Sequence, residues 1–176
     1  MAAWRGCAST ANRLTASGAD AINQMTESDA RAALTRCCGC RRWVAEMMEA
    51  RPFRDEAAMH TAAERIWWSL EAGDWRQAFT AHPRIGEQGK DAWSRDEQSG
   101  VNQAAEQTLR ALADANRSYE QRFGHVFLIC ATGLSGDQML EDLNRRLRND
   151  ATTELRVAAG EQLKITRLRL ERLGAA

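Results

Sequence analysis

The segment of the sequence most suited to chemistry is residues 81–86 (AHPRIG), which place a histidine directly before a proline. Proline pushes the residue before it into an extended backbone, so His82 is expected outside any helix, with its side chain held in a restricted direction. Gly86 allows the chain to turn or to approach a ligand closely. Histidine titrates near neutral pH and suits general acid–base catalysis. The alternative, which the residues alone leave open, is a histidine that only hydrogen-bonds within its own loop.

A second candidate is the segment of residues 94–98 (SRDEQ). Ser94 followed three residues later by Glu97 has the pattern of a capping box, which by itself explains both residues structurally. A catalytic role is compatible with capping, because a carboxylate at the start of a helix beside a catalytic loop is held rigidly. Gln98 has no capping role and offers both a hydrogen-bond donor and an acceptor. The segment is therefore either a helix start alone or a helix start that also contributes to a site.

The third candidate is Arg169, which stands between two leucines in the last expected helix. This position indicates a side chain that leans toward the core. A partly buried arginine either pairs with an acidic residue or binds an anionic ligand, and the planar guanidinium suits a carboxylate. The alternative is an arginine on a solvated helix face. A solvated face is also the simplest interpretation of Arg145, Arg146 and Arg148, at the expected C-terminal end of a helix.

Apolar residues recur with a helical period through most of the chain from Thr26 onward, which predicts an all-α protein. Residues 74–93 have no sustained period and are expected to form an irregular loop, and their aromatic residues favour an ordered, functional one. Gly73 is expected to end the helix that Asp55 caps. The short run of residues 127–130 (FLIC) is compatible with a strand-like segment or a buried connection. The expected helices cover residues 26–38, 41–50, 55–72, 94–122, 137–148 and 153–172.

The composition places these elements in one ordinary globular domain. The 176 residues suffice for a single hydrophobic core, and 24 Lys and Arg residues balance 24 Asp and Glu residues. This balance argues against a nucleic-acid partner, and no apolar stretch reaches the ~18–20 residues of a membrane span. We therefore expect a single-domain multi-helix bundle with an irregular active-site loop over residues 22–173. Residues 1–21 are expected to be a poorly ordered N-terminal extension.

The cysteines argue against both a disulfide framework and a metal site. There are five, an odd number, and three of them crowd into residues 37–40 (CCGC). A structural zinc site needs four ligands, and no second CxxC or HxxxH follows. We expect buried thiols that flank a helix break at Gly39, no metal, and a cytoplasmic location.

At residues 82–86 (HPRIG) the sequence resembles the OHCU decarboxylases, the 2-oxo-4-hydroxy-4-carboxy-5-ureidoimidazoline decarboxylases of urate degradation. The resemblance continues, in the family's order, over about residues 22–173. One departure is Cys40, where many members have a serine that can cap the next helix. The other matching motifs are CCG, RWV and RPF near the start, SRDEQSG at residues 94–100, YEQRFGHVFLIC at residues 119–130, and RLRN and KITRLRL in the closing helices.

The resemblance implies a specific site and reaction. His82 would be the catalytic acid–base residue, with Glu97 orienting or sharing its proton, and Arg169 would bind an anionic part of the substrate. The reaction would be decarboxylation of the ureidoimidazoline to (S)-allantoin and CO2, with no cofactor and no metal, by a homodimeric enzyme. Further substrate contacts would come from Pro83, Ser94, Gln98, Phe127 and Ile129.

Two other functions remain open at this point. One is an all-helical interaction module whose Trp- and Met-rich faces bind a partner protein, although such a module has no need for a His-Pro segment next to a Glu-Gln pair. The other keeps the fold but acts on a different ureide, by ring hydrolysis or decarboxylation. Only substrate testing distinguishes this last function from the implied one.

Overall fold

The computed structural model describes residues 17–83 and 99–174, with residues 99–105 given by their backbone alone. All regular structure in this described part is helical, which confirms the predicted all-α fold. None of these helices has the length and apolar character needed to cross a membrane. The helices are α1 (Gly18–Gln24), α2 (Glu27–Cys37), α3 (Arg41–Glu49), α4 (Glu56–Ser69), α5 (Ala72–Phe79), α6 (Ser99–Phe123), α7 (Gly136–Arg146) and α8 (Ala151–Glu171), followed by the 3-10 turn η2 (Arg172–Gly174).

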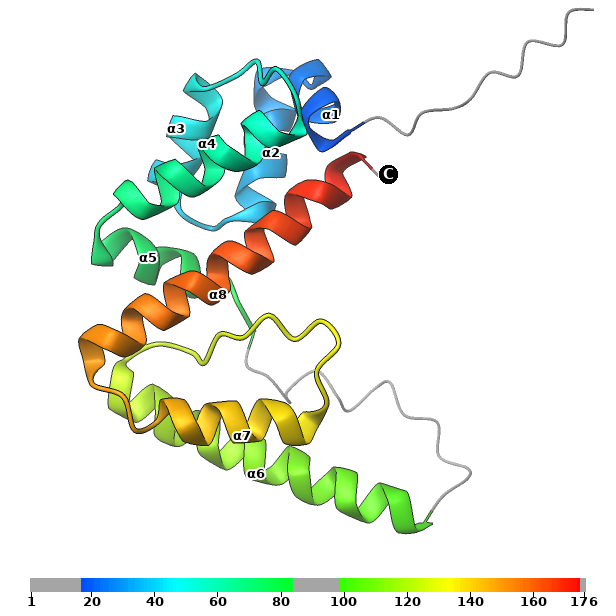
Figure 1. Ribbon diagram of the computed structural model, residues 1–176, viewed down its shortest axis with the longest axis vertical. Helices are drawn as coiled ribbons and strands as arrows, with labels where there is room; N and C mark the ends of the chain where they lie inside the picture. Colours follow the sequence, from blue (N-terminus) through cyan, green and yellow to red (C-terminus); the bar gives the residue numbers. More distant parts are fainter. Residues whose placement is uncertain (1–16, 84–98, 175–176) are drawn as a thin grey trace, which may run out of the picture.

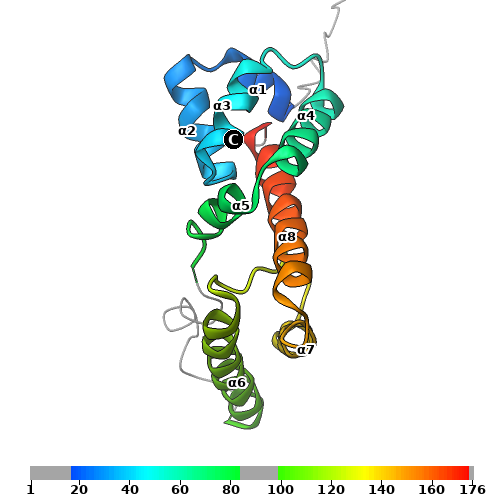
Figure 2. The same cartoon turned by 90° about the vertical axis from the view of Figure 1, so that its left-hand side faces the viewer.

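Helix α8 is the long element that joins the two ends of the molecule (Figure 1). At one end it packs against α2 and α4, and η2 continues it onto α1. At the other end α6 and α7 lie side by side, as the turned view also shows (Figure 2). The segment between these two helices runs back along them, so α6 and α7 point in the same direction (Figure 1). Helix α5 contacts α8 between the two ends and leads the chain to His82.

The apolar core divides into two clusters. The larger cluster lies among α1–α5 and α8 and contains Trp43 and Trp67, both fully buried. Their indole N–H groups donate to main-chain carbonyls of α4 and α8, at 3.1 Å and 2.9 Å respectively. The smaller cluster includes Tyr119 and lies among α6, α7 and the side chains of Phe127 and Ile129, whereas Leu128 between them belongs to the larger cluster. Each cluster therefore holds one end of the molecule together.

Polar side chains just before the first helical residue determine where several helices begin. Asp55 accepts a hydrogen bond from Ala58 N at 2.7 Å, which confirms its predicted capping role. Cys40 occupies the same position before α3, and its Sγ accepts a hydrogen bond from Trp43 N at 3.4 Å. The thiol thus serves as the cap at the position where a serine is common, so the departure noted at Cys40 does not remove the cap.

Residues 74–79, expected to be irregular, are helical, and Gly73 does not end a helix. Helix α4 has already ended before Gly73, which is the second residue of α5. The start of α5 is stabilised by Asp74, whose carboxylate accepts a hydrogen bond from Glu71 N at 3.3 Å. With only 8 residues, α5 is too short to display a sustained period in the sequence.

The first helix begins before the expected domain boundary. Ser17 caps it, and Ala19 and Ile22 are buried in the larger cluster. Residues 18–21, which were expected in the N-terminal extension, therefore belong to the first helix. Residues 1–16 of that expected extension lie outside the described residues.

Candidate active site

His82 lies in the turn that follows α5, three residues after Phe79, and is half-buried. Its backbone N–H donates to Phe79 O at 3.1 Å, and the exposed Pro83 then carries the chain away from the helix. The preceding residue, Ala81, lies against the turn between α2 and α3, where a Cβ on Gly39 would be 2.7 Å from Ala81 Cβ. Glycine at position 39 therefore permits the close approach that brings His82 to the end of α2.

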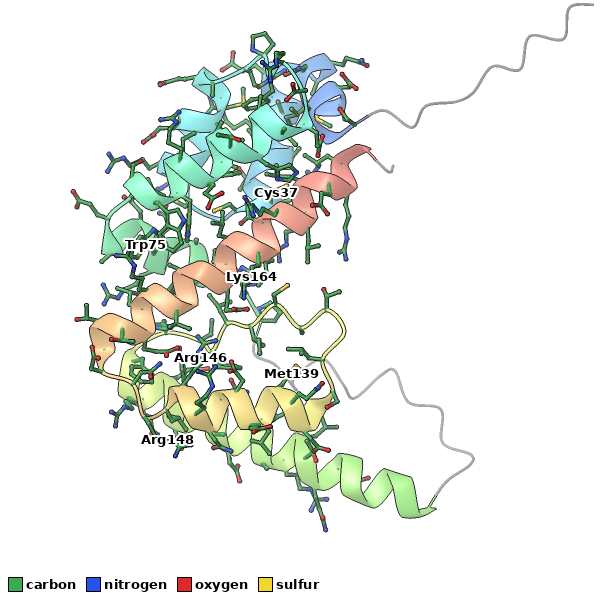
Figure 3. The ribbon with its side chains drawn as sticks, in the orientation of Figure 1. Cys37, Trp75, Met139, Arg146, Arg148 and Lys164 are labelled. Carbon is green, nitrogen blue, oxygen red and sulfur yellow. The ribbon has the colours of Figure 1, made fainter. Side chains whose placement is uncertain are left out.

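Three polar side chains of α8 lie on the helical face that is directed toward the end of α2: Gln162, Thr166 and Arg169. Gln162 and Thr166 are buried although both are polar. Gln162 Nε2 donates to Thr166 Oγ1 at 3.1 Å, and Thr166 Oγ1 donates to Cys37 O at 3.4 Å. Figure 3 shows Cys37 alongside this part of α8. Neither Gln162 nor Thr166 was predicted from the sequence, although polar residues at i, i+4 and i+7 in an apolar helix stripe are a signal that could have found them.

Arg169 reaches across to the C-terminal end of α2. Its Nη1 group donates to Arg36 O at 3.1 Å and to Cys37 O at 3.4 Å. The carbonyl end of a helix carries partial negative charge, which stabilises a guanidinium there. The side chain is half-buried against a neighbouring helix, where it binds carbonyl groups rather than an acidic residue. Within the described residues its other N–H groups make no hydrogen bond, and a carboxylate can use them.

The surroundings of His82 favour the neutral imidazole. Burial lowers the pKa of His82 below its usual value, and the positive charge of Arg169 lowers it further. A hydrogen-bonding contact with Gln162 raises the pKa of His82 but does not outweigh the other two effects. His82 is thus uncharged near neutral pH, which is the form that can accept a proton.

The two thiols at the end of α2 are protonated at neutral pH. Burial raises the pKa of Cys37 to about 11 and the pKa of Cys38 to about 12. Both cysteines are therefore poor nucleophiles, and the prediction of buried thiols around Gly39 is confirmed. Among the residues that the structure describes, no three His, Cys, Asp or Glu side chains gather where they could hold a metal ion.

Residues 127–130 form a buried connection, which decides between the two predicted possibilities. The ring of Phe127 packs against Tyr119 with ring centroids 5.2 Å apart, and Ile129 belongs to the same cluster. The side chains of both predicted contact residues are thus part of the smaller core. Their main-chain N–H and C=O groups make no hydrogen bond to other described residues. The main chain is therefore what Phe127 and Ile129 can offer a ligand.

The same connection is held in place at two points. Arg146 Nη1 donates to Leu128 O at 2.7 Å, and Cys130 N donates to Glu161 Oε2 at 2.8 Å. Glu161 directly precedes Gln162 on α8, so the second bond fixes the end of the connection next to the polar face of that helix.

Arg146 was expected on a solvated face and is instead fully buried. Its Nη2 and Nε groups donate to Glu154 Oε1 at 2.6 Å and 2.9 Å, and Tyr119 OH donates to the same carboxylate. Figure 3 shows Arg146 between α7 and α8, whereas Arg148 lies on the outer side of α7. The prediction for Arg146 was wrong because its fully buried acidic partner, Glu154, belongs to the next helix, whereas the partner on its own helix, Asp142 at 3.6 Å, is partly exposed.

The remaining predicted residues Ser94, Glu97 and Gln98 lie outside the described residues, and so does the capping box expected there. Among the predicted residues that are described, the structure brings His82 and Arg169 together at the end of α2.

Fold and site together define an all-helical domain with a neutral histidine and an arginine at one point, suited to proton transfer on an anionic ligand. The chain belongs to the OHCU decarboxylase family, since the model of that family, described as OHCU decarboxylase, matches residues 23–171. The match includes both the histidine and the arginine of the site.

Curated relatives agree with this membership. The "Uric acid degradation bifunctional protein TTL" of Arabidopsis thaliana is 36% identical over 146 residues, which cover 78% of this chain and 45% of that protein. The "2-oxo-4-hydroxy-4-carboxy-5-ureidoimidazoline decarboxylase" of Haloferax volcanii is 27% identical over 132 residues, which cover 73% of this chain and 79% of that protein. The chain spans less than half the length of the bifunctional relatives that it matches, 45% in Arabidopsis thaliana and 27% in a Bacillus species.

Solved structures show the same fold. A "Crystal structure of OHCU decarboxylase in the presence of (S)-allantoin" has a TM-score of 0.68 at 30% identity, and the match covers 86% of this chain and 100% of that one. A "Crystal structure of (S)-allantoin synthase" has a TM-score of 0.61 at 16% identity, over 86% of this chain and 52% of that one. The second likeness concerns the fold alone.

Proposed function

We propose that this protein catalyses the decarboxylation of 2-oxo-4-hydroxy-4-carboxy-5-ureidoimidazoline to (S)-allantoin and CO2, without a cofactor, as a step of urate degradation. The observation that carries the proposal is the neutral His82 beside Arg169 in a chain of the OHCU decarboxylase family. A neutral base and a cation at one point suit a substrate that has both a hydroxyl proton to give and a carboxylate.

The proposed reaction needs positioned proton transfers. Loss of CO2 leaves an electron pair on the ring carbon that carried the carboxylate, and the conjugated ring of the substrate takes up this pair. The hydroxyl group on that carbon becomes a carbonyl by losing its proton, and the neighbouring ring carbon gains a proton at the stereocentre of the product. His82 accepts the hydroxyl proton and returns a proton to one face of the ring, which gives the S configuration.

Arg169 binds an anionic part of the substrate in this proposal. Its Nη1 group is engaged by the carbonyls of Arg36 and Cys37, which holds the guanidinium plane in place and leaves other donors for the ligand. The same charge helps to keep His82 neutral before the substrate arrives. Arg169 therefore has two roles, one toward the substrate and one toward the base.

The remaining contacts are proposed from the family resemblance. The main-chain groups of Phe127 and Ile129 supply hydrogen bonds that stabilise the negative charge developing on the substrate. Pro83 shapes the loop that carries the histidine. Ser94 and Gln98 contact the ring and ureido groups, and Glu97 orients or shares the proton of the histidine.

Circular dichroism of freshly made substrate tests the reaction and the base together. Spontaneous decay of the substrate gives racemic allantoin, so only an enzyme produces a growing (S)-allantoin signal. We expect a fast rise with the wild-type protein and a kcat lower by about 10²–10⁴-fold in His82→Ala, which is the usual contribution of a general acid–base residue. Far-UV spectra of the variant should match the wild type, because His82 lies outside the helices.

His60→Ala is the matched control, since His60 is another partly buried histidine whose Nε2 lies 3.2 Å from Glu56 Oε1, on α4. This variant should retain the wild-type rate. Folded wild-type protein that gives no signal above spontaneous decay would refute the reaction and leave the interaction module or a different ureide as the function. An active His82→Ala would refute the role of the histidine.

A matched pair of arginine variants tests substrate binding. Hydrogen bonds to charged groups contribute about 1.5–3 kcal/mol, so Arg169→Ala should raise KM by roughly tenfold or more. Arg167→Ala should leave KM unchanged, because Arg167 pairs with Glu64 on the surface at 2.6 Å. Equal KM values in the two variants would contradict the assignment of Arg169.

We also propose that the protein is a cytoplasmic homodimer. The four cysteines in the described part of the chain are free thiols, which is typical of a reducing compartment. The homodimer is what the family resemblance implies. Size-exclusion chromatography with light scattering should give twice the chain mass of 19.6 kDa, and a mass of one chain would refute the dimer.

A further inference from the structure

Two consecutive hydrogen bonds fix the orientation of the Gln162 amide. Cys37 O is a carbonyl oxygen and can only accept, so the Thr166 hydroxyl donates its proton to it, at 3.4 Å. With that proton used, the Thr166 oxygen accepts a hydrogen bond from Gln162 Nε2, at 3.1 Å. The other end of the amide, Gln162 Oε1, is therefore the end available to a different neighbour.

Near the end of α2, two buried polar atoms lack a hydrogen-bond partner among the described residues: Gln162 Oε1 and His82 Nε2. Gln162 as a whole is completely buried. The two side chains are neighbours at the end of α2, where Ala81 lies against Gly39 and Thr166 bonds to Cys37 O. Gln162 is close enough to raise the pKa of His82. Pairing these two atoms satisfies both, whereas leaving both buried and unpaired is costly.

We propose that Gln162 is a positioning residue that holds the neutral His82 ring in the tautomer with its proton on Nε2. An amide oxygen only accepts hydrogen bonds, so its partner on the imidazole must be an N–H group. Nδ1 then carries the lone pair and is the atom that takes the proton from the substrate. This inference rests on the proposed role of His82 and specifies which of its two nitrogens performs that role.

The opposite arrangement removes one of the observed hydrogen bonds. If the Gln162 amide were turned over, its Nε2 would donate to His82, and Thr166 would give its proton to Gln162 Oε1. Cys37 O would then keep only the bond from Arg169 Nη1, at 3.4 Å. The structure instead has Cys37 O accepting from both Thr166 and Arg169, which favours the tautomer with the proton on Nε2.

Nitrogen NMR of the full chain labelled with 15N-histidine tests the tautomer directly. Protonated and unprotonated imidazole nitrogens differ widely in chemical shift, and of the three histidines the one at position 82 is identified by its loss in His82→Ala. We expect a neutral ring with Nε2 protonated and Nδ1 unprotonated, and the reverse would overturn the proposal. The measurement needs no turnover, so its failure is distinguishable from a failure of the proposed reaction.

Matched substitutions of Thr166 test the pair of hydrogen bonds. Thr166→Val keeps the shape and removes the hydroxyl, which frees the Gln162 amide to turn, whereas Thr166→Ser keeps the hydroxyl. We expect Thr166→Val to show both tautomers and a kcat at least roughly tenfold lower, since the wrong histidine tautomer costs about 10⁴-fold in a serine-protease triad. KM should change much less, and Thr166→Ser should recover both properties.

An unchanged tautomer and kcat in folded Thr166→Val would overturn the proposal. If this variant does not fold, the 15N spectrum of the wild-type protein decides alone.

The pH profile gives an independent readout. Gln162→Leu should move the acid limb of kcat/KM to lower pH, because the contact that raises the pKa of His82 is gone. A purely structural role would lower activity at every pH without moving that limb, and this result would also overturn the proposal.

Discussion

Replacing Glu154 by glutamine removes a buried charge and keeps the shape of the side chain. The native carboxylate accepts hydrogen bonds from Arg146 at 2.6 Å and 2.9 Å, from Tyr119 OH, and from Asn149 Nδ2 at 2.7 Å. Arginine does not lose its charge at neutral pH, so Glu154→Gln removes the buried acidic partner of Arg146 and leaves it the partly exposed Asp142, whose Oδ2 lies 3.6 Å from Nη1. The variant therefore measures what the charge of Glu154 contributes to the free energy of unfolding.

The expected magnitude follows from the burial of the pair. Removing one partner of a buried ion pair costs about 3–5 kcal/mol, and both side chains are 0% exposed, so solvent does not screen the remaining charge. Glutamine still accepts one hydrogen bond from Arg146, which places the expected loss near the lower limit, about 3 kcal/mol. In a chain of this length about 1 kcal/mol corresponds to about 2–4 °C, so the melting temperature should fall by about 6–12 °C.

Urea denaturation followed by far-UV circular dichroism measures this loss. Glu27→Gln is the control, because Glu27 pairs with Arg31 at 3.3 Å while the two side chains are 79% and 50% exposed, and it should change stability by less than about 0.5 kcal/mol. A loss below about 1 kcal/mol in Glu154→Gln would refute the reasoning. It would show that the shape and hydrogen bonding of Glu154, and not its charge, hold Arg146 in the core.

The acid limb of kcat/KM should have its midpoint below pH 6.5, because burial and a neighbouring positive charge lower the pKa of His82 and a base must be unprotonated to act. A midpoint above pH 6.5 in the pH–rate profile would contradict this prediction. Gly39→Ala should cost about 1–3 kcal/mol in urea denaturation, because its Cβ would be 2.7 Å from Ala81 Cβ. Adding Ala81→Gly should recover most of this loss, and no recovery would exclude that contact as the cause. In a Cys7→Ser background the half-exposed Cys130 should react first with a thiol reagent, and mass spectrometry showing earlier labelling of a buried thiol would contradict this.

Elements that depend on one local residue were predictable from the sequence. Asp55 was predicted to cap a helix from its type and position, and it does so. Gly73 was misleading, because a glycine just after a helix and a glycine in the first turn of the next helix are alike in a sequence. The distinguishing feature is the carboxylate of Asp74, which stabilises a new helix start. Prediction therefore failed where two helices follow each other almost without a gap.

Side chains whose surroundings come from a distant helix were not predictable. Arg146 has the local features of a solvated arginine at a helix end, with the partly exposed Asp142 one turn before it, and the fully buried Glu154 on α8 explains its burial. Gln162 is an ordinary polar residue in an apolar stripe until His82 of another segment is placed beside it. The position of His82 outside a helix was predictable because its signal, the following proline, is local. The leucines that flank Arg169 indicated a partly buried side chain, but its carbonyl partners on α2 were not predictable.

Because the apolar core forms two clusters, we expect the molecule to have two cooperative units that open separately. Helices α6 and α7 bury their apolar faces on each other and on Phe127 and Ile129, while α8 extends from them into the larger cluster (Figure 2). Partial opening of the smaller unit exposes its amide hydrogens to exchange with solvent while those of α2–α4 stay protected. Arg146 joins this unit to α8 through Glu154, so the ion pair contributes to the free energy of that partial opening. The exchange rates of α6 and α7 therefore report on one buried arginine.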